Sequence, residues 1–244
     1  MTARLATPRA AARWAGLGYV AIFFLAIFAN FLALGSVLDP GDATATASAL
    51  VEHETAFRWG AVAFLAIFLI DVVVAWALYA LFRDVHRDLA LVSAWFRLTY
   101  TVLLGVALVF LYLALELVGS ASDDSVLLAL RSFDFLWIVG LAAFGVHLVL
   151  VGRLVLMTDR APRPIAWLLV VAGAAYVVDT VAHVVLSDYE RYADAFLALV
   201  AVPSVIGEMS LAVWLLLVAA GRCPWGPGER SGQDRSTSLP VDVH

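Results

Sequence analysis

Lysine is absent from this 244-residue chain, whose fifteen basic residues are all arginine. Without a lysine amine, the protein cannot hold retinal or a carbonyl substrate as a Schiff base, and it lacks the lysine of a nucleotide-binding P-loop. Cysteine occurs once, at Cys223. A single thiol excludes an internal disulfide and any zinc site that needs several thiolates.

Charged residues are also scarce, at 14% of the chain against 64% hydrophobic residues. Soluble globular domains have an apolar fraction of about 45 to 50%. The composition therefore indicates a protein that crosses the lipid bilayer several times. No basic stripe or stacking-aromatic motif points to nucleic acid, so we expect no nucleic-acid partner.

Six apolar runs are long enough to cross a bilayer, which takes about 20 residues in a helix. The first run exceeds a signal-peptide core of about 7 to 15 residues, which predicts a retained span, with a leader cleaved near residues 33–35 as the alternative. The expected fold class is all-α, a six-helix membrane bundle. The predicted spans are Trp14–Gly35, Trp59–Phe82, Leu89–Gly119, Val126–Met157, Ile165–Leu186 and Ala195–Gly221.

The spans form one predicted domain, residues 14–221, after a short basic N-terminus, residues 1–13. The tail, residues 222–244, is rich in Gly, Pro, Ser and charge, a composition that predicts disorder. Eleven arginines lie on the side of the two termini, against three on the other side, with Arg97 inside a span. The positive-inside rule therefore predicts a multi-pass protein of the bacterial cytoplasmic membrane with both termini in the cytoplasm.

The segment between the first two spans opens with a turn, residues 39–41, after which Asp42 or Thr44 can cap a short helix through Phe57. Its pattern predicts an amphipathic helix on the extracytoplasmic membrane surface. Glu54 and Arg58 are four residues apart in the favourable order for an ion pair. We interpret them as a solvated pair or as part of a gate over a site.

Three acids, Asp71, Asp179 and Glu208, lie near the middle of separate spans. A carboxylate there costs about 2.5 to 3.5 kcal/mol on the insertion scale, so such residues usually face a bundle interior. Arg97 is the only deep basic residue. Either the acids clamp helices together, or at least one carboxyl group is protonated, or a cation occupies the site.

The fifth span places Tyr176, Asp179 and His183 on one helical face. They are candidates for an acid-base pair, although ordinary helix packing gives the same spacing. A zinc site is geometrically conceivable but has no local ligand motif; its candidate ligands, all toward the outer face, are His53, Glu54, His183, Asp134 and Glu116. Because His147 and His183 belong at different depths, a bis-histidine haem is disfavoured. We therefore expect no cofactor and no bound metal.

Several short blocks in chain order are similar to the bacterial domain-of-unknown-function family 4386, a group of small six-helix membrane proteins. The resemblance implies the fold and the membrane location, and no activity. The blocks are Arg13–Gly16, Gly41–Ala43, Glu54–Gly60, Asp71 with Leu78 and Tyr79, Phe96 with Arg97, Ala172–Tyr176, Pro203 with Gly207 and Glu208, and Trp214–Leu216.

Three functions remain open from the sequence. The first is a proton- or cation-coupled carrier or binder of a small or lipid-soluble molecule, using the carboxyl groups near the midplane. The second is an intramembrane enzyme in which Glu208 or Asp179 acts as a general acid on a lipid or isoprenoid-like substrate. The third is a structural or accessory subunit in which the acids only hold helices together.

Overall fold

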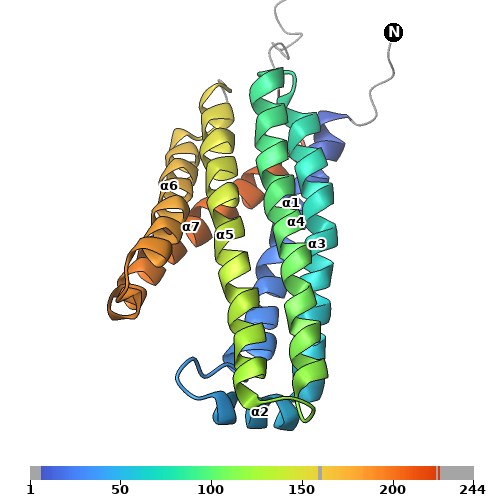
Figure 1. Cartoon of the computed structure of the whole chain (residues 1–244). Helices are drawn as coiled ribbons and strands as arrows, with labels where there is room; N and C mark the ends of the chain where they lie inside the picture. Colours follow the sequence, from blue (N-terminus) through green and yellow to red (C-terminus); the bar gives the residue numbers. More distant parts are fainter. Residues whose placement is uncertain (1–6, 159–160, 224, 226–244) are drawn as a thin grey trace, which may run out of the picture.

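A computed structural model of the protein describes residues 7–158, 161–223 and 225, and within these ranges it contains helices and no strand (Figure 1). Six helical segments are long and apolar enough to cross a membrane, which confirms the predicted fold class. The helices are α1 (Pro8–Ala29), continued by the π-helical turn η1 (Asn30–Gly35), α2 (Ala43–Glu52), α3 (Glu54–Phe82), α4 (Arg87–Leu117), α5 (Asp123–Leu156), α6 (Arg163–Val185), the short 3₁₀ helix η2 (Tyr189–Tyr192) and α7 (Ala193–Ala219).

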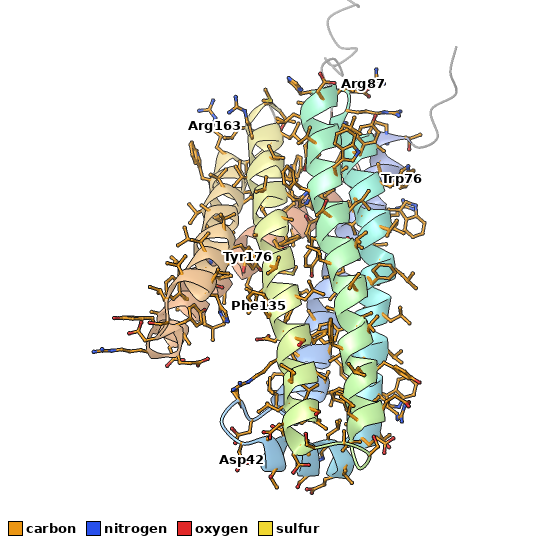
Figure 2. All side chains as sticks on the ribbon, viewed as in Figure 1. Asp42, Trp76, Arg87, Phe135, Arg163 and Tyr176 are labelled. Carbon is orange, nitrogen blue, oxygen red and sulfur yellow. The ribbon has the colours of Figure 1, made fainter. Side chains whose placement is uncertain are left out.

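The six long helices form a closed ring. Each packs mainly against two others, in the order α1, α3, α4, α5, α6, α7 and back to α1. The start of α1 and the end of α7 lie together at one end of the ring, where Arg9 approaches Gly221. We call this the termini end. Figure 2 places Arg87 and Arg163 at this end and Asp42, which caps α2, at the opposite end, the α2 end.

Side-chain caps start several helices where the sequence changes from loop to apolar run. The Thr7 hydroxyl accepts a hydrogen bond from the amide of Ala10, with Pro8 in the first turn of α1. The Asp42 carboxylate accepts one from the amide of Ala45 at 2.9 Å. Of the two predicted caps for the short helix, Asp42 is therefore the one that acts.

The short helix is shorter than predicted. α2 ends at Glu52, and a break at His53 separates it from α3, which already includes Glu54, Phe57 and Arg58. The prediction that the helix runs through Phe57 is wrong because Phe57 is fully buried as part of α3. Placement of α2 on a membrane surface stays a prediction, and in Figure 1 the helix lies at the end of the bundle.

The other spans begin up to two turns earlier than predicted, because charged first-turn residues such as Asp123 and Asp124 extend the apolar runs. Pro203 lies within α7 without ending it. The tail that was predicted to be disordered, residues 222–244, lies outside the described residues except for 222, 223 and 225.

Glycines bring α5 and α6 into backbone contact near their middles. A Cβ atom added to Gly145 would lie 2.5 Å from the carbonyl oxygen of Gly173, and one added to Gly173 would lie 2.3 Å from that of Gly145. Small residues permit such close approach between membrane helices. Toward the α2 end the hydroxyl of Thr180 on α6 still donates to the backbone oxygen of Ile138 on α5, and past this point α6 and α7 swing away from α5 (Figure 1).

Candidate functional site

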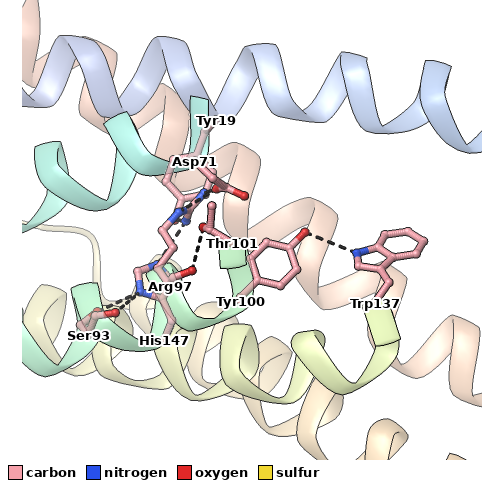
Figure 3. A network of polar contacts seen from close by, with 8 residues as sticks. All are labelled: Tyr19, Asp71, Ser93, Arg97, Tyr100, Thr101, Trp137 and His147. Atoms are coloured by element: carbon pink, nitrogen blue, oxygen red, sulfur yellow. Dashed lines mark hydrogen bonds and ion pairs between the residues drawn. The ribbon is translucent and has the colours of Figure 1, made fainter. Parts of the chain in front are cut away.

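The centre of the ring holds a polar network to which four helices contribute: α1, α3, α4 and α5 (Figure 3). Arg97 of α4 donates from Nε and Nη2 to Oδ1 of Asp71 on α3, at 2.9 and 2.5 Å. Both side chains are only 1% exposed. The sequence predicted both residues as site candidates, and the structure joins them as an ion pair.

The remaining donors of Arg97 are also engaged. Its Nη1 donates to the hydroxyl of Tyr19 on α1 at 2.9 Å and lies 3.2 Å from Nε2 of His147 on α5. The guanidinium carbon lies 4.8 Å from the ring centre of Tyr19 and 5.4 Å from that of Phe144, within the range of cation–π attraction. Arg97 is thus held from three other helices.

The contacts of His147 assign its tautomer. Guanidinium groups only donate, so Nε2 of His147 must accept from Arg97 and carry no proton. Nδ1 then carries the proton and donates to the backbone oxygen of Ser93, 2.9 Å away. His147 is therefore neutral in this arrangement, and it orients Arg97 without adding charge.

Glu208 of α7 faces this network from across the ring. It continues the interior stripe of Ser204 and Leu211, which are 4% and 0% exposed. It lies within electrostatic range of Arg97 and Asp71. No hydrogen bond or ion pair joins Glu208 to another described residue. The residue as a whole is half-buried.

Tyr176 of α6 completes the set, so that each of the six helices contributes one polar side chain near the ring centre. Its ring contacts Phe144, at 5.6 Å between ring centres, and its hydroxyl faces Ser204 and lies within electrostatic range of Glu208 and Asp179. Figure 2 shows Tyr176 about midway along α6. Tyr176 therefore lies between the central network and the residues further along α6.

Asp179 belongs to a second polar group, closer to the α2 end. Its Oδ1 accepts a hydrogen bond from the hydroxyl of Tyr189 at 2.7 Å. The ring of His183 lies 4.1 Å from that of Tyr189, and His183 in turn is within electrostatic range of Asp134 on α5. Nδ1 of His183 is buried without a hydrogen-bond partner among the described residues. The structure thus separates Asp179 from the Asp71 and Arg97 pair.

Comparison with known proteins identifies the family of this chain. The family described as Domain of unknown function (DUF4386) matches residues 14–219, most of the chain. The chain belongs to this family. An uncharacterized protein of Archaeoglobus fulgidus is 26% identical over 151 residues, which cover 62% of this chain and 78% of that relative. No solved structure matches the chain.

Within this DUF4386 protein, the remaining predicted residues lie away from the centre. Glu54 and Arg58 form an exposed ion pair of 2.7 Å on the first turns of α3, where the structure shows no site for them to cover. Among the described residues, no three His, Cys, Asp or Glu side chains are placed to hold a metal ion. The geometry therefore gives no support to the zinc alternative.

Sequence reasoning missed the roles of Tyr19 and His147, the two residues besides Asp71 whose side chains bond Arg97. A neutral tyrosine or histidine in an apolar span carries little of the cost that singles out a carboxylate. Depth was the available signal: both lie about three turns from the termini end of their helices, the same depth as Arg97, Asp71 and Glu208.

Proposed function

We propose that this DUF4386 protein is a proton-coupled membrane carrier or binder of a small or lipid-soluble molecule, in which Glu208 gains and loses the proton. One observation carries the proposal. Arg97, the deep basic residue, is already engaged by Asp71, Tyr19 and His147, and Glu208 faces this group without a hydrogen bond.

Charge balance supports this role. Asp71 and Arg97 neutralise each other, and His147 is neutral, so an ionised Glu208 leaves one uncompensated negative charge at the ring centre. An unpaired charge in a medium of low dielectric constant is costly, and protonation removes it. A proton, or one positively charged ligand, restores balance. The carboxyl group is therefore suited to exchange one for the other.

The competing function is a structural or accessory subunit. It is favoured by the geometry of Asp71 and Arg97, whose buried, doubly bonded contact is that of a helix clamp. The two roles are compatible at the level of residues, because the clamp uses Asp71 and Arg97 while the proton is assigned to Glu208. Only a change in the protonation of Glu208 distinguishes a carrier from a purely structural protein.

Infrared difference spectroscopy tests this assignment without knowledge of the ligand. Purified protein in lipid nanodiscs is taken from alkaline to acidic pH, and the carbonyl stretch of a newly protonated buried carboxyl group is recorded. We expect a band that is absent in Glu208→Gln and retained in Glu116→Gln, the same substitution in another span, near the α2 end of α4. The amide bands of both variants should match those of the wild-type protein.

Two results would contradict the proposal. One is a wild-type spectrum in which no buried carboxyl group changes protonation. The other is a band that persists in folded Glu208→Gln protein and disappears in Asp71→Asn, which would assign the proton to the pair with Arg97. Either result leaves the structural role as the better account of the polar centre.

A further inference from the structure

We infer that Glu208 exchanges its proton with the aqueous phase at the α2 end of the bundle, through Tyr176, Asp179, Tyr189 and His183, while an apolar layer closes the termini end. The inference rests on the proposed function and adds the route and the side from which the site is reached. Three independent features of the ring carry it.

The first feature is a continuous run of polar side chains along one face of α6. Tyr176 lies within electrostatic range of both Glu208 and Asp179. Asp179 then accepts from the hydroxyl of Tyr189, whose ring contacts His183. Hydroxyl, carboxyl and imidazole groups both donate and accept hydrogen bonds, which is the property needed to pass a proton along.

The run ends among charged groups on α5 and η2. Asp134 of α5 is half-buried and lies within electrostatic range of His183 and of Glu190 in η2. Glu190 is followed by the exposed Arg191. Nδ1 of His183 is buried and has no hydrogen-bond partner among the described residues, which leaves it free to bond a water molecule. The polar run thus leads from the ring centre to a charged turn.

The second feature is the side of the ring toward the termini end, where the polar side chains next to Arg97 are His147 and Ser93, which are buried and bonded to each other. From Glu208 onward the interior stripe of α7 is apolar, with Leu211 and Leu215 both 0% exposed. The facing helices contribute side chains of the same kind to one buried hydrophobic core. They include Leu78, Leu81, Leu148, Val151, Leu169 and Ala172. An apolar, closely packed layer excludes water and therefore blocks proton exchange.

The third feature is the divergence of the helices. Gly145 and Gly173 press α5 and α6 together, and Gly152 does the same against the backbone of Ala166, closer to the termini end. Beyond Gly145, toward the α2 end, α5 and α6 stay joined as far as Thr180, whose hydroxyl donates to the backbone oxygen of Ile138 at 3.0 Å, and past this point α6 and α7 diverge from α5 (Figure 1). The helices are therefore closest around the apolar layer and diverge toward the end of the polar run.

Cysteine accessibility tests the inference directly, because removing Cys223 alone gives a cysteine-free background. In Cys223→Ala protein we place single cysteines at His183 and at Ala172, which share one face of α6. A third at Val184, 62% exposed on the outside of the bundle, reports on the lipid or detergent surface. A charged, membrane-impermeant thiol reagent is then applied to protein in nanodiscs, where both ends are accessible.

We expect rapid labelling at His183→Cys and none at Ala172→Cys or Val184→Cys, since the reagent reacts with thiols that water reaches. Equal labelling at His183→Cys and Ala172→Cys would overturn the inference, and so would the absence of labelling at His183→Cys in folded protein. Tyr189→Cys, at the residue whose hydroxyl bonds Asp179, provides a second position if His183→Cys does not fold.

A kinetic measurement separates this inference from the proposed function. After a rapid drop in pH, the infrared band of Glu208 should appear about 10²-fold more slowly in Asp179→Asn, the lower end of what a positioned proton donor contributes. Its final amplitude should be unchanged. An unchanged rate in Asp179→Asn refutes the route and leaves Glu208 as the proton site. Absence of the band in the wild-type protein refutes the proposed function itself.

Discussion

At the scale of single residues, the centre of the bundle is built around one buried guanidinium. Arg97 is 1% exposed, and its guanidinium is held by polar side chains of other helices and by the aromatic faces of Tyr19 and Phe144. Removing one partner of such a pair leaves an unpaired charge inside the protein. The cost of that loss greatly exceeds the net contribution of the pair itself.

The Asp71→Asn substitution should therefore lower the free energy of unfolding by about 3 to 5 kcal/mol. The matched control is Glu54→Gln, which breaks the exposed pair with Arg58 and should change stability by no more than about 0.5 kcal/mol. Unfolding in mixed SDS micelles, followed by tryptophan fluorescence, measures both. Equal effects in the two variants would show that burial does not determine the strength of the clamp.

The charged members of the site were predictable from sequence, and their partners were not. Asp71, Arg97 and Glu208 stand out because charge is costly within an apolar span. Which acid pairs with Arg97 depends on the order of helices around the ring, and no local sequence pattern encodes that order. Tyr19 and His147 escaped prediction for a related reason, since their role arises only from their distance to Arg97.

At the scale of elements, the decisive contact is the crossing of α5 and α6. A methyl group at Gly145 would lie 2.5 Å from a backbone carbonyl oxygen, which cannot move aside as a flexible side chain can. The crossing sets the point of closest approach between the backbones of α5 and α6. It thereby sets where the apolar layer ends and the polar run along α6 begins.

Gly145→Ala should accordingly destabilise the protein by about 1 to 3 kcal/mol, the usual cost of overpacking. Gly140→Ala, on the same helix, is the control, because its added methyl group would meet side-chain atoms of Tyr100 and Leu103 at 3.3 and 3.4 Å, which can shift. Thermal unfolding in detergent compares the two. If Gly140→Ala were the more harmful change, backbone contact would not be the constraint at this crossing.

The number and order of the helices could be predicted from the apolar runs in the sequence, whereas the residues at which the helices begin and end could not. An apolar run locates the part of a helix that lies in lipid, whereas the helix itself continues into charged first turns such as Asp123 and Asp124. The boundary at His53 was missed because Glu54 and Arg58 have the spacing of a surface helix. Burial of Phe57 against the ring assigns that stretch to α3 instead.

At the scale of the whole molecule, six helices in a closed ring place the start of α1 and the end of α7 on one side. The arginine count predicts that this side is cytoplasmic. Fusions test the prediction: green fluorescent protein after His244 should fluoresce, and alkaline phosphatase fused after Ala121, between α4 and α5, should be active. The reverse pattern would invert the orientation and would place the α2 end, with its polar run, in the cytoplasm.

Ring closure itself could not be read from the sequence. Short loops imply that consecutive spans lie side by side, which accounts for every contact in the ring except one. The exception is the contact of α1 with α7, where Gly16 lies against Ala212 and Leu216. The sequence around Gly16 does not indicate which helix this residue contacts.

The contact of α1 with α7 also has a consequence for how the protein is made. A ribosome makes α1 first and α7 last, so the contact that closes the ring must wait until the whole chain has entered the membrane. Until then Arg97 and Asp71 can pair within the α3 and α4 hairpin, but the side of the site that Glu208 closes stays open to lipid. The nascent chain therefore has a period in which its polar centre is exposed, and we expect insertion factors or quality-control proteases to recognise chains that stop before α7.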